Sequence, residues 1–309
     1  MNVVVAVDGG GSKTDGVVAD AATGAELARR RGPGCSHHAI GVTRSVEVID
    51  AVVTETLAAA GASYDDVARC GCYLTAIDLD SEQTGMHEAL SVFAWARGLL
   101  VENDVYALLR AGTDAPDAAV VVCGTGINGA AIRADGATAR ILALGQRSGD
   151  WGGASGIAEE VLWYAARDED GRGEPTALRA ALLEWTGRAS VRDVITDVHT
   201  GRLEVSAWWS CVPEVMRLAH AGDVVAESLV TRQGSEIGVL AGSLLGRLGL
   251  AGAAVPVVLG GGIAASGDEL LLSATASSLQ QRAPHARIVV CRRPPVEGAL
   301  ELTLAAVPR

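Results

Sequence analysis

Short apolar blocks alternate along the chain with longer segments of helical periodicity. The first block, VVVAV at residues 3–7, is followed by DGGGSKTD and then by a second apolar block, GVVA at 16–19. Continuous valine-rich runs bounded by glycine and aspartate are typical of buried strands. The same signals predict further elements, namely strands at 69–75 and 98–104 and helices at 42–60, from residue 81 and at 105–111. This alternation predicts an α/β fold.

The later part of the chain is mostly helical in its pattern. A strand is predicted near 140–144, before the glycine-rich loop GQRSGDWGGASG, and helical periodicity dominates from residue 157. The charged stretch RDEDGRGEP at 167–175 is predicted to be a loop. Residues 255–280 are predicted to form a buried strand, a triple-glycine turn and a helix, and residues 286–307 a last strand and a closing helix.

Two segments of the chain resemble each other. VVVAVDGGGSKTDGVVADAATG at 3–24 and AVVVCGTGINGAAIRADGATA at 119–139 both read as a hairpin with a glycine-rich tip. Such an internal repeat predicts a duplicated α/β fold whose two halves bring both tips into one cleft between domains. We expect the boundary near 112–117, which gives an N-terminal domain at 1–115 and a C-terminal domain at 116–309. The closing helix can pack back on the N-terminal domain.

Composition narrows the class of protein. The chain has 309 residues, 49% of them hydrophobic and 20% charged, which suits a well-cored protein of two domains. A net charge of −12 without a basic cluster argues against nucleic acid or an anionic membrane as the partner. The most apolar stretch, 251–265, is interrupted by Pro256 and by glycines, so no membrane span is predicted. The N-terminus lacks the features of a secretory signal, and we expect a cytoplasmic protein with a small ligand.

Cysteine, histidine and tryptophan give weaker signals. Four of the six cysteines lie in or beside apolar runs, and the Cys-x-Cys pair Cys70 and Cys72 has no second pair to complete a zinc site. We therefore interpret the cysteines as buried thiols. The adjacent histidines at 37–38 are expected in a solvated loop, and the other histidines show no ligand spacing. The adjacent tryptophans at 208–209 are expected to pack a helix into the second domain.

The DGGGSKTD loop is a candidate phosphate site. The nucleotide-binding P-loop and the dinucleotide fingerprint both need a helix after the glycines, whereas DGVVAD follows here as a strand. A loop at a hairpin tip remains, in which glycines let backbone N–H groups approach phosphate and Ser12, Lys13 and Thr14 add hydroxyls and charge. The alternative is a plain glycine hairpin, which the recurrence at 124–128 disfavours.

Two aspartates stand at strand ends. Asp8 closes the first strand, where it would repel a polyphosphate unless Mg²⁺ intervened, so we expect it to hold Mg²⁺ through water. The alternative is an aspartate that caps its own turn. Asn103 and Asp104 lie where a buried strand ends and a helix starts, the position at which α/β sheets present ligand-binding residues. Asp104 is either a helix N-cap or a general base that accepts a proton from a substrate hydroxyl.

With these residues in view, the chain resembles the sugar kinase, heat-shock protein and actin superfamily. Within it, the chain is similar to the BadF/BadG/BcrA/BcrD ATPases and N-acetylglucosamine kinases. The resemblance rests on five motifs in order, DGGGSKTD, ENDVYALLRAG, VVVCGTGIN, SGDWGGASG and VVLGGGIAASGDELL. It implies a duplicated actin-like, ribonuclease H-like fold and the use of ATP with Mg²⁺.

The resemblance also implies roles for individual residues. Asp104 would be the base, and Asp8 would serve the metal. The residues implied to bind ATP are Gly10, Gly11, Ser12, Lys13, Thr14, Gly124, Thr125, Gly126, Gly261 and Gly262. The residues implied to line the sugar pocket are Asn103, Asp104, Asn128 and Asp150, with Ser36 where the group usually has an asparagine. A Trp-Gly-His stretch that helps hold the sugar in animal members corresponds here to residues 144–146.

The resemblance implies an ATP-dependent kinase that transfers the γ-phosphate to a hydroxyl of an amino sugar or its N-acetyl derivative. The alternative is an ATPase that drives a partner protein, as activators of acyl-CoA dehydratases do with a shared iron–sulfur cluster. Here Cys123 lies within a predicted strand, and no cysteine pair frames a helix for such a cluster. A sugar sensor without turnover is a third option, which the retained Asp8 and Asp104 disfavour. Many proteins of this group dimerise, so a homodimer is allowed.

Overall fold

The computed structural model describes residues 1–307, which contain two five-stranded sheets. The first has the strand order β3-β2-β1-β4-β5 and the second the order β10-β9-β6-β7-β8. Read from its other edge, the second sheet repeats the order of the first, so the predicted duplication is confirmed. The strands are β1 (Val3–Gly9), β2 (Lys13–Asp20), β3 (Glu26–Pro33), β4 (Val67–Leu74), β5 (Leu100–Asn103), β6 (Ala118–Cys123), β7 (Ile127–Ile132), β8 (Thr138–Arg140), β9 (Pro256–Gly260) and β10 (Arg287–Val290).

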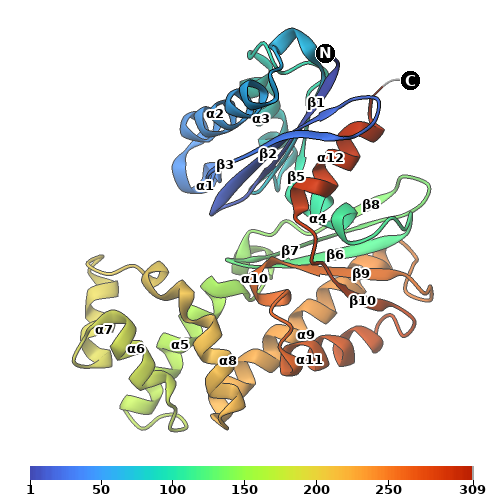
Figure 1. Cartoon of the computed structure of the whole chain (residues 1–309). Coiled ribbons are helices and arrows are strands. Elements are labelled where there is room, and N and C mark those ends of the chain that lie inside the picture. The colour runs from blue at the N-terminus through green and yellow to red at the C-terminus, as the bar shows by residue number, and fades with distance from the viewer. Residues whose placement is uncertain (308–309) are drawn as a thin grey trace. The chain divides into compact units, whose positions relative to one another are not determined.

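Helices connect and cover these strands (Figure 1). The α-helices are α1 (His37–Ile40), α2 (Val42–Ala60), α3 (Asp80–Ser91), α4 (Asp104–Gly112), α5 (Gly153–Glu169), α6 (Leu178–Thr186), α7 (Val191–His199), α8 (Val212–His220), α9 (Val224–Arg247), α10 (Gly261–Ala264), α11 (Glu269–Gln280) and α12 (Pro295–Ala305). Three short 3₁₀ segments are η1 (Tyr64–Asp66), η2 (Gly145–Ser148) and η3 (Val205–Cys211).

The chain forms two compact units. The first unit comprises Met1–Val120, Ile132–Leu142 and the chain from Cys291 onward. The second comprises Val121–Ala131 and Ala143–Val290. Helix α12 therefore belongs to the same unit as the N-terminal strand. The domain ranges expected from the sequence stay predictions.

The first sheet is covered on both faces by helices, because the side chains of β1 alternate between the two sides. Val5 and Val7 pack in one core cluster with residues of α2 and α3, such as Ile49. Val4 and Ala6 pack in the other cluster, with residues of α4 and α12. A run of valines buried on both faces is what the continuous apolar pattern of this strand predicts.

Helix α12 packs very closely on its neighbours. A Cβ on Gly298 would overlap the carbonyl oxygen of Ala107 in α4, and a Cβ on Gly71 in β4 would overlap the hydroxyl of Thr303. The two glycines therefore allow the helix to approach both α4 and the sheet. Since α4 begins at Asp104, α12 supports the helix that carries the candidate base.

The second unit contains a closely packed helix pair. Gly234, Gly238 and Gly242 repeat every fourth position of α9, and a Cβ on the first two would meet the backbone of α11. This small-residue stripe lets the two helices approach. Trp208 is buried and donates its indole N–H to the Ala158 carbonyl at 3.0 Å. Trp209 is 38% exposed, so the prediction that both tryptophans pack into the domain is wrong for Trp209.

Other expectations have mixed outcomes. The cysteines of residues 1–307 are all buried and free, which confirms the interpretation as core thiols.

The strand expected near 140–144 is Thr138–Arg140 instead, and residues 141–144 follow it without strand pairing. Ala143 has a φ of 54°, which a strand does not accommodate. Within residues 1–307, no helix combines the length and apolarity that crossing a bilayer requires.

Candidate functional site

The first glycine loop joins β1 to β2 in an antiparallel hairpin. The backbone N–H of Gly10 donates to the carbonyl of Lys13 at 2.8 Å, which closes the turn, and Gly11 and Ser12 are exposed. A Cβ on Gly34 would overlap the Gly11 carbonyl, so the segment after β3 lies directly against the loop. The loop thus presents exposed backbone at Gly11 and Ser12 on a fixed support, as phosphate recognition requires.

Two side chains of this loop that were expected at its tip make contacts within the protein instead. The Thr14 hydroxyl is fully buried and donates to the Pro33 carbonyl at 2.7 Å, so the prediction that it faces the tip is wrong. Lys13 lies 3.1 Å from Asp15, which also accepts two hydrogen bonds from Arg31, at 2.6 and 3.0 Å. Asp15 therefore partly neutralises Lys13. Ser12 keeps the exposed position expected of it.

Asp8 stands directly opposite Asp15 in the register of β1 and β2. Its side chain is buried, and burial together with the Asp15 charge raises the pKa of Asp8 to about 7, although Lys13 and Arg31 oppose the shift. A buried carboxylate with this pKa is costly to ionise unless a cation binds nearby. The pKa of Asp15 is lowered instead, because the hydrogen bonds that its carboxylate accepts from Arg31 and Lys13 outweigh the effect of burial.

Asn103 and Asp104 take distinct roles at the start of α4. The Asn103 side chain accepts a hydrogen bond from the Val105 N–H at 3.1 Å, so Asn103 is the helix N-cap. It also donates to the carbonyl of Ile77, and its side chain is fully buried. Its hydrogen-bonding atoms are engaged within the protein, and a place for Asn103 in the sugar pocket stays a prediction. Asp104 is the first residue of the helix, and the cap does not use its carboxylate.

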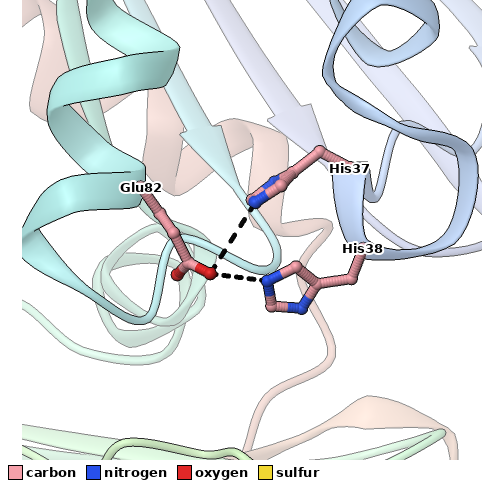
Figure 2. Close-up of side chains that lie close together, drawn as sticks. All are labelled: His37, His38 and Glu82. Carbon is pink, nitrogen blue, oxygen red and sulfur yellow. Dashed lines mark hydrogen bonds and ion pairs between the residues drawn. The ribbon is translucent and has the colours of Figure 1, made fainter.

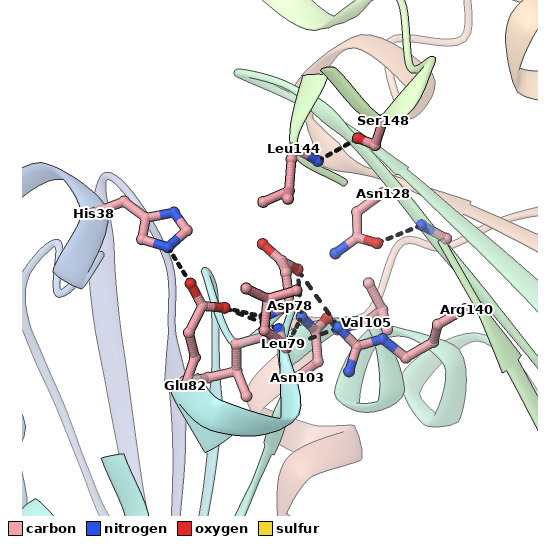
Figure 3. Close-up of polar contacts among 12 residues, drawn as sticks. His38, Asp78, Leu79, Glu82, Asn103, Val105, Asn128, Arg140, Leu144 and Ser148 are labelled. Atoms are coloured by element: carbon pink, nitrogen blue, oxygen red, sulfur yellow. Dashed lines mark hydrogen bonds and ion pairs between the residues drawn. The ribbon is translucent and has the colours of Figure 1, made fainter. Parts of the chain in front are cut away.

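A buried polar network supports this corner of the sheet (Figure 3). Asn103 donates to the Asp78 carboxylate at 3.0 Å, and Arg140 of β8 approaches the same carboxylate at 3.5 Å. Arg140 also donates to the Ile77 carbonyl at 2.7 Å. Ala76, just before this segment, has a φ of 64°. A left-handed alanine costs about 1 kcal/mol, and the neighbouring hydrogen bonds hold it in place.

The environment of Asp104 suits proton transfer. Burial raises the pKa of Asp104 to about 7, the Asp8 and Asp78 charges contribute to the rise, and Arg140 opposes them. Its accessible surface is nevertheless intermediate, so the side chain is crowded by protein but still reachable. A carboxylate with a pKa near the working pH is well matched to general-base catalysis.

The second glycine loop lies between β6 and β7 and is supported from two sides. The carbonyls of Gly124 and Thr125 accept hydrogen bonds from the N–H groups of Ala154 and Ser155 at the start of α5, at 2.8 and 2.9 Å. Gly261, with a φ of 83°, lies so close to Cys123 that a Cβ would overlap the backbone there. The predicted phosphate loop and the predicted adenosine turn therefore meet within the second unit.

The other predicted ATP and sugar residues are exposed to different degrees. In the ATP set, Gly126 and Gly262 are exposed. Asp150 follows η2, accepts a hydrogen bond from Ser148 at 2.5 Å and lines a pocket of about 450 Å³ in the second unit. Figure 3 shows the Leu144–Ser148 hydrogen bond that shapes the same loop.

The sugar-side residues Asn128 and Ser36 lie in different units. Asn128 is half-buried on β7, in the second unit. Ser36 is the N-cap residue of α1, in the first unit.

Two sheets of identical strand order, each with a glycine hairpin, define a duplicated actin-like ATPase fold. The chain belongs to the BadF/BadG/BcrA/BcrD ATPase family, whose model matches residues 5–301. This match covers the glycine loops, Asp104 and the adenosine turn. It confirms the family resemblance and the use of ATP that the motifs imply.

Named relatives are similar over most of the chain. The N-acetyl-D-glucosamine kinase of Dictyostelium discoideum is 24% identical, over 98% of this chain and 98% of that protein. The N-acetylmuramic acid/N-acetylglucosamine kinase of Clostridium acetobutylicum is 23% identical over 77% of each chain. A crystal structure assigned as an N-acetylglucosamine kinase from Chromobacterium violaceum has a TM-score of 0.74 at 22% identity, covering 98% of this chain and 99% of its own.

Several residues of the site escaped prediction from the sequence. Asp15 could have been found by counting outward from the hairpin tip, because the register pairs Asp8 with Asp15 as it pairs Gly9 with Thr14. Asp78 and Arg140 carry no such local signal. They lie 62 positions apart and meet only when β8 joins the first unit.

Proposed function

We propose that the protein is an ATP-dependent kinase that phosphorylates a hydroxyl of an amino sugar or an N-acetyl amino sugar. The observation that carries the proposal is the state of Asp104. Its carboxylate stands at the first position of α4, is released from capping by Asn103 and has its pKa raised to about 7 by burial. A half-buried carboxylate of this kind at the end of a sheet is suited to accept a proton from a sugar hydroxyl.

The chain's own residues divide the remaining tasks. The exposed backbone of Gly11 and Ser12 in the first unit binds phosphate oxygens through N–H groups, and that of Thr125 and Gly126 does so in the second. The N–H groups of Gly10 and Gly124 close their own loops. The turn at Gly261 and Gly262 lets the adenosine lie against backbone. Asp150 orients sugar hydroxyls, with Asn128 and Ser36 as further contacts. Asp104 removes the proton as the hydroxyl attacks the γ-phosphate.

Asp8 is the residue that would hold Mg²⁺. A buried carboxylate beside a phosphate loop fits this ion, which keeps most of its waters and takes one or two carboxylates together with substrate phosphates. The raised pKa of Asp8 fits as well, because a cation nearby would favour the ionised form. When bound, Mg²⁺ supplies charge neutralisation at the phosphates.

The class of substrate is supported by two relatives, which are named as N-acetylglucosamine and N-acetylmuramic acid/N-acetylglucosamine kinases. Both act on N-acetyl amino sugars by name, and this supports the same class for the protein.

The test is ADP release from MgATP with glucosamine, N-acetylglucosamine, N-acetylmannosamine, N-acetylmuramic acid and glucose. We expect one amino sugar to stimulate turnover, and Asp104→Asn to lower that rate about 10²–10⁴-fold. Asp80→Asn is the matched control, since Asp80 is likewise the first residue of a helix but is exposed. Slow ATP turnover that no sugar changes, or equal rates in the two variants, would overturn the proposal and favour an ATPase that drives a partner.

A further inference from the structure

Two histidines and a glutamate converge at one point of the first unit (Figure 2). His37 and His38 are the first residues of α1, and Glu82 lies in the first turn of α3. The His38 Nε2 is 2.6 Å from the Glu82 Oε1, and the His37 Nε2 is 3.8 Å from the same oxygen. The expectation of a solvated pair is therefore wrong for His37, whose side chain is 12% exposed.

The carboxylate of Glu82 is held in place by backbone. Its Oε2 accepts hydrogen bonds from the N–H groups of Asp78 and Leu79 at 2.8 and 2.9 Å. This leaves Oε1 directed at the histidines (Figure 2).

Both histidines offer ring nitrogens to an ion, because each places its Nε2 within 4 Å of the same Glu82 oxygen. Imidazole nitrogen is a common metal ligand. His38 is 46% exposed, which gives an ion a path to the cluster and leaves room for a water.

We propose that His37, His38 and Glu82 bind a divalent transition metal ion, with Zn²⁺ as the ion best matched to the site. One ligand atom from each residue lies within 4.8 Å of the others. Ligands about 2.0–2.1 Å from a tetrahedral Zn²⁺ are about 3.3 Å apart, so side-chain shifts of about 1 Å suffice. Two histidines and one glutamate form a known zinc set that leaves the fourth position open. Mg²⁺ is excluded as the natural occupant because it prefers oxygen ligands.

The position of this metal site predicts what metal binding does to the first unit. The segment before His37 supports the first glycine loop through Gly34. Glu82 accepts a hydrogen bond from the backbone N–H of Asp78, whose carboxylate accepts one from the Asn103 side chain. An ion that ties α1 to α3 therefore links the support of the phosphate loop to the cap of the Asp104 helix. Occupancy should stabilise the first unit.

The experiment uses the full chain after treatment with a chelator. The protein is titrated with Zn²⁺ in competition with a chromophoric chelator, and with Co²⁺ while the visible absorption is recorded. Thermal unfolding with and without Zn²⁺ gives a second readout that does not depend on kinase activity. The variants are His38→Ala and Glu82→Gln, the second of which keeps an amide oxygen for the backbone N–H groups of Asp78 and Leu79. His87→Ala is the control, because His87 is exposed on the same helix outside the cluster.

We expect one equivalent of Zn²⁺ to bind, the melting temperature to rise by several degrees and Co²⁺ to give a tetrahedral spectrum. Each ligand variant should weaken binding by at least about tenfold, whereas His87→Ala should bind like the wild type. Circular dichroism of each variant checks that it is folded. The proposal is overturned if Zn²⁺ fails to bind the wild type or if Glu82→Gln binds it equally well. It is also overturned if His87→Ala loses as much affinity as His38→Ala.

Discussion

The β1–β2 and β6–β7 hairpins occupy equivalent places in two sheets of the same strand order, yet their strands end differently. In the first, DGGG places Asp8 at the end of β1, and in the second, CGTG places Cys123 at the end of β6. Both side chains are buried. Burial raises the pKa of Asp8 to about 7 and the pKa of Cys123 to about 12. Topology has therefore been kept while the chemistry of this position has diverged.

The difference indicates which task both glycine loops perform and which task only the first performs. Backbone N–H groups are present in both loops and suit phosphate in either. A group that can carry negative charge near neutral pH is present in the first alone, since a thiol with a pKa of about 12 stays neutral. Cys123 instead provides backbone against which Gly261 packs. We infer that the first loop serves the metal-binding side of the nucleotide and that the second serves binding alone.

The largest effect should come from removing the carboxylate charge at the end of β1. Asp8→Asn is expected to lower kcat/KM for ATP about 10²–10³-fold and to raise the Mg²⁺ concentration needed for half-maximal rate, because a metal ligand is lost. Cys123→Ser should leave the Mg²⁺ dependence unchanged. Initial rates measured over a Mg²⁺ series check both variants. A similar loss in the two would contradict the division of tasks.

The next effect concerns the backbone beside Cys123. Gly261→Ala is expected to destabilise the second unit by about 2–4 kcal/mol, because the added Cβ meets the Cys123 backbone and the φ of 83° disfavours alanine. Gly262→Ala is the control, since its Cβ would have no neighbour in residues 1–307 within 4 Å. Urea unfolding and the KM for ATP are the measurements. Equal stability of the two variants would show that the close approach is not needed.

The pH dependence sharpens the contrast between carboxylate and thiol. Asp8 and Asp104 each have a folded pKa of about 7 against an ordinary value of 3.8, so between these values the folded state binds more protons than the unfolded state. Stability from these groups is therefore lost as the pH rises from about 4 through 7. Compared with the wild type, Asp104→Asn should gain more than about 1 kcal/mol between pH 5 and pH 8. Thermal unfolding across this range checks it, and a pH-independent difference would refute the raised pKa.

The smallest effect concerns the first loop alone. Thr14→Val is expected to cost about 1 kcal/mol of stability, because the hydrogen bond to the Pro33 carbonyl is lost, while the KM for ATP stays near that of the wild type. Ser12→Ala should do the opposite and raise the KM without a change in unfolding. A raised KM in the Thr14 variant would restore that hydroxyl as a phosphate ligand.

Local sequence signals were sufficient for much of this fold. The valine run of β1, the glycines after it and the echo at β6 are periodicities within a few residues, and α2 begins and ends as predicted, at Val42 and Ala60. The pattern could not decide whether Asp104 is the helix cap or a general base. A cap and the first residue of a helix differ by a single position, which periodicity does not resolve. Hydrogen bonding assigns the cap to Asn103.

Side chains that meet across long stretches of sequence lay beyond prediction. His38 and Glu82 are 44 positions apart, and Arg110 of α4 meets Glu301 of α12 across 191 positions. Each pair depends on how helices pack on the sheet, which no local pattern encodes. The stripe of Gly234 and Gly238 was readable in the sequence, but its partner helix was not.

The packing of α12 on the first sheet has a consequence for biosynthesis. A ribosome releases the chain from its N-terminus, so the face of β1 that carries Val4 and Ala6 has only α4 to cover it until α12, which ends at Ala305, has emerged. The second unit ends at Val290. Order of synthesis and order of completion are therefore reversed. The unit that holds the N-terminus is finished last, and until then the part of its sheet that α12 covers is an apolar surface that a chaperone would bind.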